Sequence, residues 1–416
     1  MNTNKKVLVG IDGMPHKMVV DLCKKEIMPN LASLVDEGNL RIMQSSTPAV
    51  SSISWNSIIT GANPGQHGIY GFSDIIKGTY SMCFPNSNAL KKPPYWQTIK
   101  GTHVVINVPA TYPVKKINGC HISGFVSLDM DKAVYPAKII PKLEELDYQI
   151  DVDAEKGHKS ATLLLDELFK TLKARTKALN FLWDKYSWDT LMYVITGSDR
   201  IEHFLWHVYE DEGHTLHERF LEFYGLIDEI IGNINNRLNE DDSLIILSDH
   251  GMERVKYNIN LNSHLINEGF LHLRDEGRGY NRIDDGSSAF ALEDGRIYIN
   301  RRGHYPRGMV EAEREPELKQ EIRDSFMSLK IAGDKVIKKA HLREEIYHGP
   351  QLDNAPDVVL VPNKGFNLRG KLSNVLSENS PLSGMHNPQA FLYTKNIDDS
   401  FNVEHPTVED VIKLVS

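Results

Sequence analysis

Short runs of apolar residues alternate along the chain with longer segments in which apolar residues recur every three or four positions. The first pattern is typical of strands buried on both faces, and the second of helices with one buried face. Their alternation predicts an α/β fold with a doubly wound, mostly parallel central sheet and helices on both faces. The expected strands are residues 6–11, 102–108, 191–196, 243–247, 357–361 and 389–393. The expected helices are residues 28–38, 52–60, 161–186, 214–238, 261–269, 311–329 and 408–415.

Two segments fit this alternation poorly. Residues 110–160 are rich in proline, glycine and short polar runs. Residues 270–310 contain the polar sequence DEGRGYNRIDDGSS, followed by a hairpin pattern around GRIYINRRG. We expect both segments to be insertions that form a cap over the carboxyl edge of the sheet. The sequence has no internal repeat or low-complexity tract, so residues 1–416 are expected to form a single domain that includes them.

Composition limits the partners and the location of the protein. The 56 acidic and 47 basic side chains give a formal charge of −9, which disfavours nucleic acid polymers and anionic membranes as partners. Three scattered cysteines, Cys23, Cys83 and Cys120, predict neither a disulfide framework nor a thiolate metal site. No apolar run reaches the roughly 18 residues of a membrane span, and the start of the chain lacks a signal-peptide pattern. We therefore expect a cytoplasmic protein, and the oligomeric state stays open.

Polar residues that directly follow buried strands are the first candidates for chemistry, because open α/β sheets bind ligands at the carboxyl ends of their strands. Asp12 follows the strand at 6–11, with Gly13 behind it to allow a sharp turn. Asp249 and His250 follow the strand at 243–247, in the sequence SDHGM. The structural alternative for each aspartate is a helix cap, and for the histidine a packed ring.

A second group of candidates lies around the sequence ITGSDRIEHFLWH. Asp199 and His203 stand four residues apart at the start of a helix, so both project from one face and can hold one metal ion. His207 continues that face one turn further on, where a packed or exposed ring is expected. His386, in SGMHNPQ, precedes the last expected strand, with a structural histidine as its alternative.

Ser51, in TPAVSSISWNSIITGANPGQHGIYG, is the candidate nucleophile. It lies at the beginning of the expected helix 52–60, where the positive end of the helix dipole and free N–H groups favour attack on a phosphorus centre. The structural alternative is capping of that helix by Ser51 or Ser52.

Taken together, these residues predict two metal sites with nitrogen and oxygen ligands around a single hydroxyl. The first site would contain Asp12, Ser51, Asp249 and His250, and the second Asp199, His203 and His386. Without cysteine among the ligands, the sites suit two divalent ions, zinc first and manganese second. Two such ions can activate a hydroxyl nucleophile and bind phosphoryl oxygens during in-line displacement.

The segments that carry these residues resemble, in order, the metal-site motifs of the alkaline phosphatase superfamily: VGIDGM, PAVSSISWNSIITGANPGQHGI, GSDRIEHF, LSDHGM and GMHNP. They are most similar to its type I phosphodiesterase/nucleotide pyrophosphatase branch and to predicted phosphohydrolases related to cofactor-independent phosphoglycerate mutase. The resemblance covers nearly the whole chain. It implies the same ligand assignment and a transient phosphoserine at Ser51, and it gives His67 no ligand role.

The sequence therefore predicts a two-metal phosphoester hydrolase that acts on a small phosphorylated substrate. Nucleotide pyrophosphatases commonly have threonine where this chain has Ser51 and asparagine where it has Phe72, whereas the related mutases and monoesterases use serine. A phosphodiesterase is the leading prediction, and a phosphomonoesterase or phosphomutase is the alternative. A noncatalytic protein that binds metal and phosphate is the second alternative. Arg200, beside Asp199, is the candidate phosphate contact, with a surface ion pair as its alternative.

Overall fold

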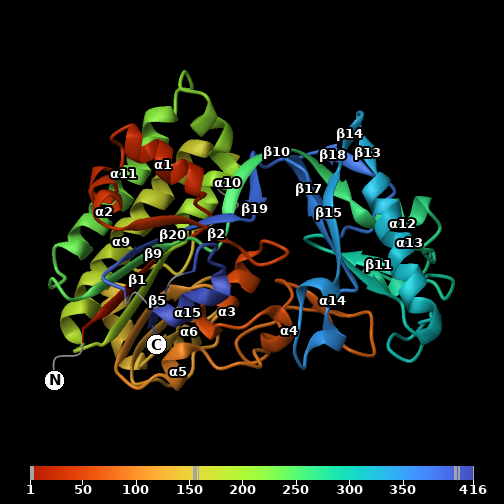
Figure 1. The fold of residues 1–416 in the computed structure, drawn as a ribbon, viewed down its shortest axis with the longest axis horizontal. Helices are drawn as coiled ribbons and strands as arrows, with labels where there is room; N and C mark the ends of the chain where they lie inside the picture. The colour runs from red at the N-terminus through yellow and green to blue at the C-terminus, as the bar shows by residue number, and fades with distance from the viewer. Residues whose placement is uncertain (1–3, 153–156, 158, 398–400, 402, 416) are drawn as a thin grey trace.

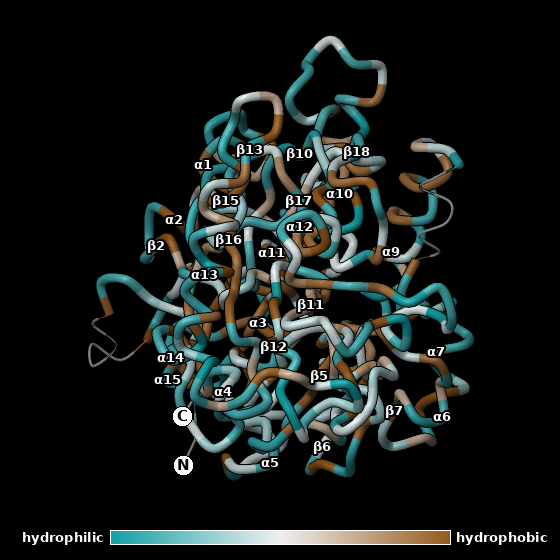
Figure 2. The backbone as a smooth tube through the Cα atoms, turned by 90° about the vertical axis from the view of Figure 1, so that its right-hand side faces the viewer, coloured by the Kyte–Doolittle hydropathy of each residue, from teal (hydrophilic) through white to brown (hydrophobic). Residues whose placement is uncertain are grey.

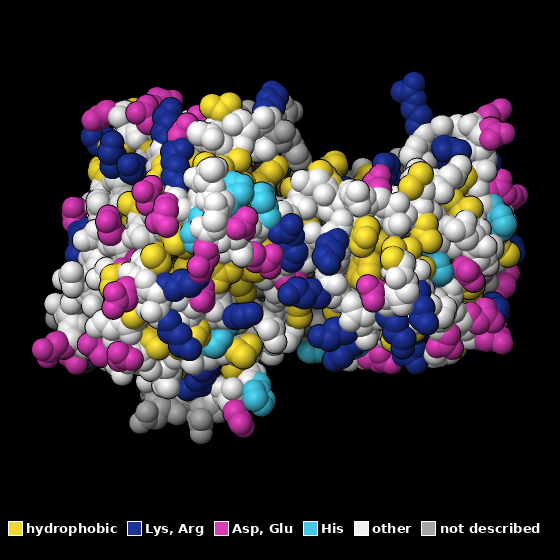
Figure 3. Space-filling model, turned by 90° about the horizontal axis from the view of Figure 1, so that it is seen from above, with side chains coloured by type: hydrophobic (Ala, Val, Ile, Leu, Met, Phe, Trp, Pro, Cys, Tyr) yellow, Lys and Arg dark blue, Asp and Glu magenta, His cyan; other side chains and the backbone are white. Residues whose placement is uncertain are grey.

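The computed structural model describes residues 4–152, 157, 159–397, 401 and 403–415. Their chain forms a larger lobe around an eight-stranded sheet and a smaller lobe around a four-stranded one (Figure 1). Each lobe has its own apolar core. Seen from above, the molecule narrows between the two lobes (Figure 3).

The eight-stranded sheet is mostly parallel, as the sequence predicts. Its strand order is β2-β20-β9-β1-β8-β5-β6-β7. The inner strands from β9 to β6 run parallel to one another, whereas β2, β20 and β7 pair antiparallel with their neighbours. Its strands are β1 (Lys6–Ile11), β2 (Asn39–Gln44), β5 (His103–Val108), β6 (Gly119–Ser123), β7 (Val134–Tyr135), β8 (Thr190–Ile195), β9 (Ser243–Leu247) and β20 (Gln389–Lys395).

Helices cover both faces of this sheet, because successive side chains of a strand point to opposite faces. In β1, Val7 and Val9 pack into one core, and Leu8 packs into the other. The first face is covered by α1 (His16–Lys24), α2 (Pro29–Glu37), α9 (Ala161–Lys185), α10 (Gly197–Glu210) and α11 (His217–Asn235). The second is covered by α3 (Ser51–Thr60), α5 (Tyr95–Thr98), η5 (Val408–Val411) and α15 (Ile412–Val415).

The smaller lobe begins where β10 (Gly251–Asn260) leaves the larger one. Figure 2 looks onto this lobe, whose outer loops are largely hydrophilic. Its four-stranded sheet has the order β11-β12-β16-β15, and β10 pairs with β17, β18 and β19. The further elements of the lobe are α12 (Leu261–Asn267), β11 (Ala289–Leu292), β12 (Arg296–Ile299), α13 (Glu315–Ser328), β15 (Ile337–Leu342), α14 (Arg343–Ile346), β16 (Val358–Pro362), β17 (Gly365–Arg369), β18 (Ser377–Asn379) and β19 (Gly384–Asn387).

Short elements complete the described chain. They are α4 (Pro64–His67), β3 (Asp74–Ile75), β4 (Met82–Cys83), α6 (Met130–Ala133), η1 (Ala137–Ile139), α7 (Ile140–Glu145), η2 (Gly279–Arg282), η3 (Ala312–Arg314), β13 (Lys330–Ile331), β14 (Asp334–Lys335) and η4 (Leu352–Asn354). No helix among the described residues is long and apolar enough to cross a membrane. The three cysteines are free thiols.

The structure corrects the expected arrangement of two strands. Residues 357–361 overlap β16, but this strand belongs to the smaller lobe and pairs antiparallel with β12 and β15. Residues 389–393 lie in β20, which belongs to the main sheet but runs antiparallel to β9. An apolar run indicates burial on both faces, but it encodes neither the sheet nor the direction of the strand.

The two expected insertions lie in different lobes. The described part of residues 110–160 supplies β6 and β7 to the edge of the main sheet. Residues 270–310 supply β11 and β12, the expected hairpin, to the smaller lobe. The capping role of both segments stays a prediction.

Candidate active site

Three neighbouring parallel strands bring three aspartates to one edge of the main sheet. Asp12 follows β1, Asp249 follows β9, and Asp199 lies in the first turn of α10, just after β8. Because β1 pairs with both β8 and β9, the three side chains come from adjacent positions. All three residues are at most 3% exposed.

Gly13 allows these strand ends to come together. Its φ of 79° lies in the left-handed region, and a Cβ atom at this position would lie 3.2 Å from the Cα atom of Asp199. The N–H group of Gly13 donates to Oδ1 of Asp249 at 3.2 Å. The Ser198 hydroxyl donates to the carbonyl of Asp12 at 2.7 Å, which joins the start of α10 to the end of β1.

Three histidines surround the aspartates, and each is held by the backbone. Nδ1 of His203 donates to the carbonyl of Gly384 at 2.9 Å, and Nδ1 of His250 to that of Gly251 at 3.0 Å. Nδ1 of His386 donates to the carbonyl of Ala49 at 3.1 Å. Since a carbonyl only accepts, these bonds leave Nε2 of each neutral ring with a free lone pair, the usual arrangement in metal-binding histidines.

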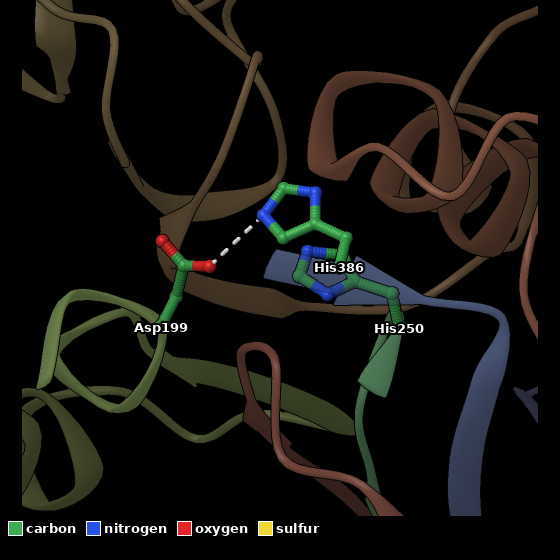
Figure 4. A group of neighbouring side chains, drawn as sticks. All are labelled: Asp199, His250 and His386. Atoms are coloured by element: carbon green, nitrogen blue, oxygen red, sulfur yellow. Dashed lines mark ion pairs between the residues drawn. The ribbon is translucent and has the colours of Figure 1, made fainter. Parts of the chain in front are cut away.

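The residues predicted for the second metal site meet at one point. Oδ1 of Asp199 lies 3.2 Å from Nε2 of His203 and 3.3 Å from Nε2 of His386, and the two nitrogens are 2.9 Å apart. Asp199 and His386 face each other, with His250 beside them (Figure 4). His386 reaches the site from β19, where it pairs with Met252 of β10.

The residues predicted for the first metal site also lie together. Nε2 of His250 is 3.3 Å from Oδ2 of Asp249 and 3.7 Å from Oδ1 of Asp12. Oγ of Ser51 is 2.9 Å from Nε2 of His250 and 3.5 Å from Oδ1 of Asp12. Ser51 is the first residue of α3, whose N-cap is Val50, and its hydroxyl makes no capping bond. The capping alternative for Ser51 is therefore wrong.

His250 joins the two groups of ligands. Its ring lies 3.8 Å, centroid to centroid, from the ring of His386. Ligand atoms of Asp199, His250 and His386 all lie within 4.8 Å of one another, as do those of Asp12, Asp249 and His250. The two predicted sites therefore adjoin. Ser51 lies on the side of the first metal site, which contains Asp12 and Asp249.

The chemistry of the buried oxygen atoms fits bound cations. Oδ1 of Asp199 and Oδ2 of Asp249 are buried without a hydrogen-bond partner. An uncompensated buried carboxylate costs several kcal/mol, so each of these oxygens calls for a positive partner. Carboxylate and hydroxyl oxygens together with imidazole nitrogens, without a thiolate, suit zinc or manganese.

Burial and mutual repulsion alter the acidity of these groups. Burial, followed by the charges of Asp249 and Asp199, raises the pKa of Asp12 well above its ordinary value. Burial and then the charge of Asp199 raise the pKa of Asp249 to about 7. Burial opposes ionisation of Asp199 too, but His203 and His386, when protonated on the Nε2 atoms that a cation would otherwise bind, hold its pKa well below the ordinary value.

The other histidines and Arg200 lie outside this ligand cluster. The guanidinium of Arg200 binds Asp151 at 2.8 Å, with Nη1 3.7 Å from Oδ2 of Asp199. His207 does not reach the ligand cluster; its ring packs edge-on against that of His214. His67 is buried, and its Nε2 lies 3.1 Å from the Ser57 hydroxyl.

Trp55 belongs to the site, although the sequence pattern did not single it out. Its indole N–H donates to Oδ2 of Asp12 at 3.0 Å, which leaves Oδ1 towards Ser51 and His250. The ring is fully buried against Gly10, where a Cβ atom would lie 2.4 Å from it. The signal that could have found Trp55 is its spacing: four residues after Ser51, it shares the same face of α3.

A family model described as type I phosphodiesterase/nucleotide pyrophosphatase matches residues 6–389. The chain belongs to this family. As a member of it, the protein is an enzyme of the phosphoric ester hydrolase class. None of the curated proteins compared with this phosphodiesterase-family chain matches it.

Solved structures share the fold of this phosphodiesterase-family protein. Phosphonoacetate hydrolase from Sinorhizobium meliloti 1021, in complex with phosphonoformate, has a TM-score of 0.65 and 15% identity over 100% of this chain and 96% of its own. The same enzyme in complex with phosphonoacetate has a TM-score of 0.64 and 15% identity, again over 100% of this chain and 96% of its own. An inactive variant of murine ectonucleotide pyrophosphatase/phosphodiesterase 5, in complex with AMP, has a TM-score of 0.55 and 14% identity. The match covers 99% of this chain and 94% of the murine one. At these identities the likeness shows the fold alone.

Replacement of Trp55 is expected to weaken metal binding. Trp55→Phe removes the hydrogen bond to Asp12, and loss of a partner that orients a ligand typically lowers metal affinity by about tenfold or more. Titration with Mn²⁺ measures the change. Trp188→Phe is the matched control, because that indole is also buried and hydrogen-bonded but lies before β8, at the other end of the strand. Equal affinity in both variants would contradict the role of Trp55.

Metal affinity is expected to rise with pH. A raised pKa means that the Asp249 carboxyl holds a proton below about pH 7, and this proton must leave before the oxygen binds a cation. One such proton weakens Mn²⁺ binding by about tenfold between pH 8 and pH 6. Calorimetric titration at both pH values, in buffers of different ionisation enthalpy, measures affinity and proton release. Asp249→Asn should bind more weakly but with a flatter pH profile, and equal wild-type affinity at both pH values would refute the coupling.

Proposed function

We propose that the protein hydrolyses a phosphoric diester with Ser51 as the nucleophile and two divalent cations as cofactors. The observation that carries this proposal is the position of the Ser51 hydroxyl, 2.9 Å from His250 and 3.5 Å from Asp12. It stands beside the ligand cluster and at the N-terminus of α3, where the helix dipole favours an incoming anionic phosphoryl group.

The proposed ligands divide as the sequence predicts. Asp12, Ser51, Asp249 and His250 would hold one cation, and Asp199, His203 and His386 the other. Zinc is the first candidate and manganese the second. When bound, the two cations supply positive charge that stabilises the phosphoryl oxygens and favours ionisation of the nucleophile.

The protein's own groups supply orientation and the nucleophile. Backbone bonds at Nδ1 fix the rings of His203, His250 and His386, and Trp55 fixes the carboxylate of Asp12. The proposed reaction forms a bond between Oγ of Ser51 and phosphorus as the bond to the leaving oxygen breaks. The resulting phosphoryl-serine ester still carries the second arm of the diester, and water then cleaves its bond to Ser51, which restores the serine and releases a phosphomonoester.

The surroundings of Arg200 favour a diester over a monoester. The guanidinium already has a carboxylate partner in Asp151 and stacks 4.8 Å from the ring of Phe125. Phe125 in turn packs 5.6 Å from Phe72. Phe72 is half-buried and Phe125 is 8% exposed, and Arg200 joins these rings to the proposed ligand Asp199. Aromatic rings in this position suit the uncharged arm of a diester, whereas a doubly charged monoester requires additional unpaired cations.

The complexes of the compared structures indicate which probes to use. They hold phosphonoformate, phosphonoacetate and AMP, all of them small phosphorus compounds. A small phosphorylated molecule is accordingly the proposed substrate class. Phosphonoacetate joins the chromogenic esters in the assays because it separates cleavage of a carbon–phosphorus bond from that of an ester.

The zinc- or manganese-loaded enzyme is expected to prefer diesters. We expect kcat/KM for bis-para-nitrophenyl phosphate to exceed that for para-nitrophenyl phosphate by about tenfold or more, since only the diester has an arm to place on the aromatic surface. Phe125→Ala should lower kcat/KM for the diester by about tenfold and leave that for the monoester nearly unchanged. Phe169→Ala, at a half-buried aromatic residue of α9, is the control. A faster monoester would support the phosphatase or mutase alternative, and a faster phosphonoacetate reaction would support a phosphonohydrolase.

Loss of the Ser51 hydroxyl is expected to abolish turnover. Ser51→Ala should lower kcat for both esters by at least about a thousandfold while most bound metal is kept, because the remaining ligands stay in place. Ser52→Ala is the matched control, since its neighbouring buried hydroxyl has no hydrogen-bond partner. Rapid quenching followed by peptide mass spectrometry should find, in the wild type, a para-nitrophenyl phosphate adduct on Ser51 with the diester and a phosphate on Ser51 with the monoester. Full activity in Ser51→Ala, or a phosphate on a different residue, would exclude this nucleophile.

A further inference from the structure

Two adjoining cavities lie beside β5 and β6, outside the catalytic cluster. The outer cavity, about 1010 Å³, opens at the amino-terminal ends of these strands, and the inner one, about 240 Å³, extends towards α3. They share Trp96, Gln97 and Lys115 in their walls. Figure 2 shows α5 and β6 at the bottom of the molecule and β10, which begins directly after His250, near the top.

Unpaired positive charge surrounds both cavities. Six lysines line them: Lys91, Lys92, Lys100, Lys115, Lys116 and Lys138. All six are exposed, and none forms an ion pair with a described carboxylate. No aspartate or glutamate occurs among the described lining residues. In a chain with a net charge of −9, such a concentration of uncompensated lysines is suited to an anionic ligand.

The inner cavity adds an aromatic wall and hydrogen-bond acceptors. Trp96 forms part of the wall; Asn56 and His121 also line the cavity, and behind its surface Oδ1 of Asn56 and Nδ1 of His121 are buried acceptors without hydrogen-bond partners, which a ligand reaches by a rotation of these side chains. Nε2 of His121 lies 3.2 Å from Oγ1 of Thr111, whose hydroxyl already donates to the carbonyl of Val108 at 2.8 Å. The imidazole must therefore donate through Nε2, which leaves Nδ1 as an acceptor.

We propose that these two cavities form a second binding site, for a compound with a short phosphate chain. The lysines bind the phosphates at the outer cavity. In a nucleoside di- or triphosphate, the ring enters the inner cavity and directs its N–H donors to Asn56 and His121. A free polyphosphate shares the phosphate contacts but lacks the ring.

The dimensions and composition of the site favour a small ligand over a nucleic acid polymer. The two volumes are of the order of the roughly 300–1,000 Å³ that small-molecule pockets measure. Every cationic side chain among the described lining residues is a lysine, because none of these residues is an arginine and burial keeps His121 neutral. The overall charge of −9 repels a long polyanion beyond the site itself.

The inner cavity also touches the helix that carries Ser51. Asn56 and Ile59 of α3 line it, and Nδ2 of Asn56 donates to the carbonyl of Ser52 at 2.6 Å. A ligand in this cavity therefore contacts α3 directly, and we expect its binding to change turnover. The effect on turnover rests on the proposed function, whereas the binding itself does not.

Calorimetric titration of the metal-loaded, full-length protein with ATP and with tripolyphosphate tests the site. Magnesium is kept in excess so that the phosphates do not remove the catalytic ions. We expect both compounds to bind, and Lys115→Ala/Lys116→Ala to lower both affinities by about tenfold or more while turnover of bis-para-nitrophenyl phosphate without added nucleotide stays unchanged. The matched control is Lys338→Ala/Lys339→Ala, which removes the same charge from exposed neighbours on β15.

The outcomes separate the two ligand sources and the two proposals. Tighter binding of ATP, with a loss in His121→Ala that tripolyphosphate does not show, supports a nucleotide site. Equal binding of both supports a free phosphate chain. The proposal is overturned if neither compound binds, if the control pair loses as much affinity, or if a single-stranded RNA oligomer binds more tightly than ATP. Unchanged binding in Ser51→Ala keeps this site distinct from the catalytic one, even if the proposed nucleophile fails its own test.

Discussion

Repulsion among the three aspartates is the constraint that governs the site. Two unit charges 4 Å apart repel each other by about 4 kcal/mol at the effective dielectric constant typical of proteins. Asp12, Asp199 and Asp249 cannot move apart, because they follow three adjacent strands whose register is fixed over their whole length. The fold therefore stabilises this arrangement only in combination with positive charge. In the absence of that charge, burial and then this repulsion raise the pKa values of Asp12 and Asp249.

Most of the site could be predicted from the sequence because its residues follow buried strands. Asp12 and Asp249 directly follow apolar runs, and parallel strands present their carboxyl ends at one edge. Asp199 and His203 could be paired because helical spacing places them on one face. His386 is different: it reaches the site through β19, whose pairing with β10 joins residues more than a hundred positions apart. Local patterns do not encode such a pairing; the sequence made His386 a candidate only because it precedes the last expected strand, and the resemblance to known motifs gave it the same role.

The smaller lobe shows what local patterns leave out. Its strand β16 has the same apolar character as the strands of the main sheet, yet it pairs with β12 and β15. The choice between two sheets depends on which surfaces remain to be buried once each core is complete, and this is a property of the whole chain. Trp55 was missed for a related reason. An apolar residue on a core-facing helix is expected to pack, and its hydrogen bond to Asp12 becomes visible only in three dimensions.

Strand β10 has a double role in the architecture. Its first four residues pair with β19, next to His250 and His386, while its later residues pair with β17 and β18, further into the smaller lobe. One continuous strand thus spans the junction, and β19 returns along it. A hinge motion at this junction would bend the same backbone that sets the spacing of two imidazole ligands. Movement of one lobe against the other and the spacing of the ion ligands are in this way mechanically coupled.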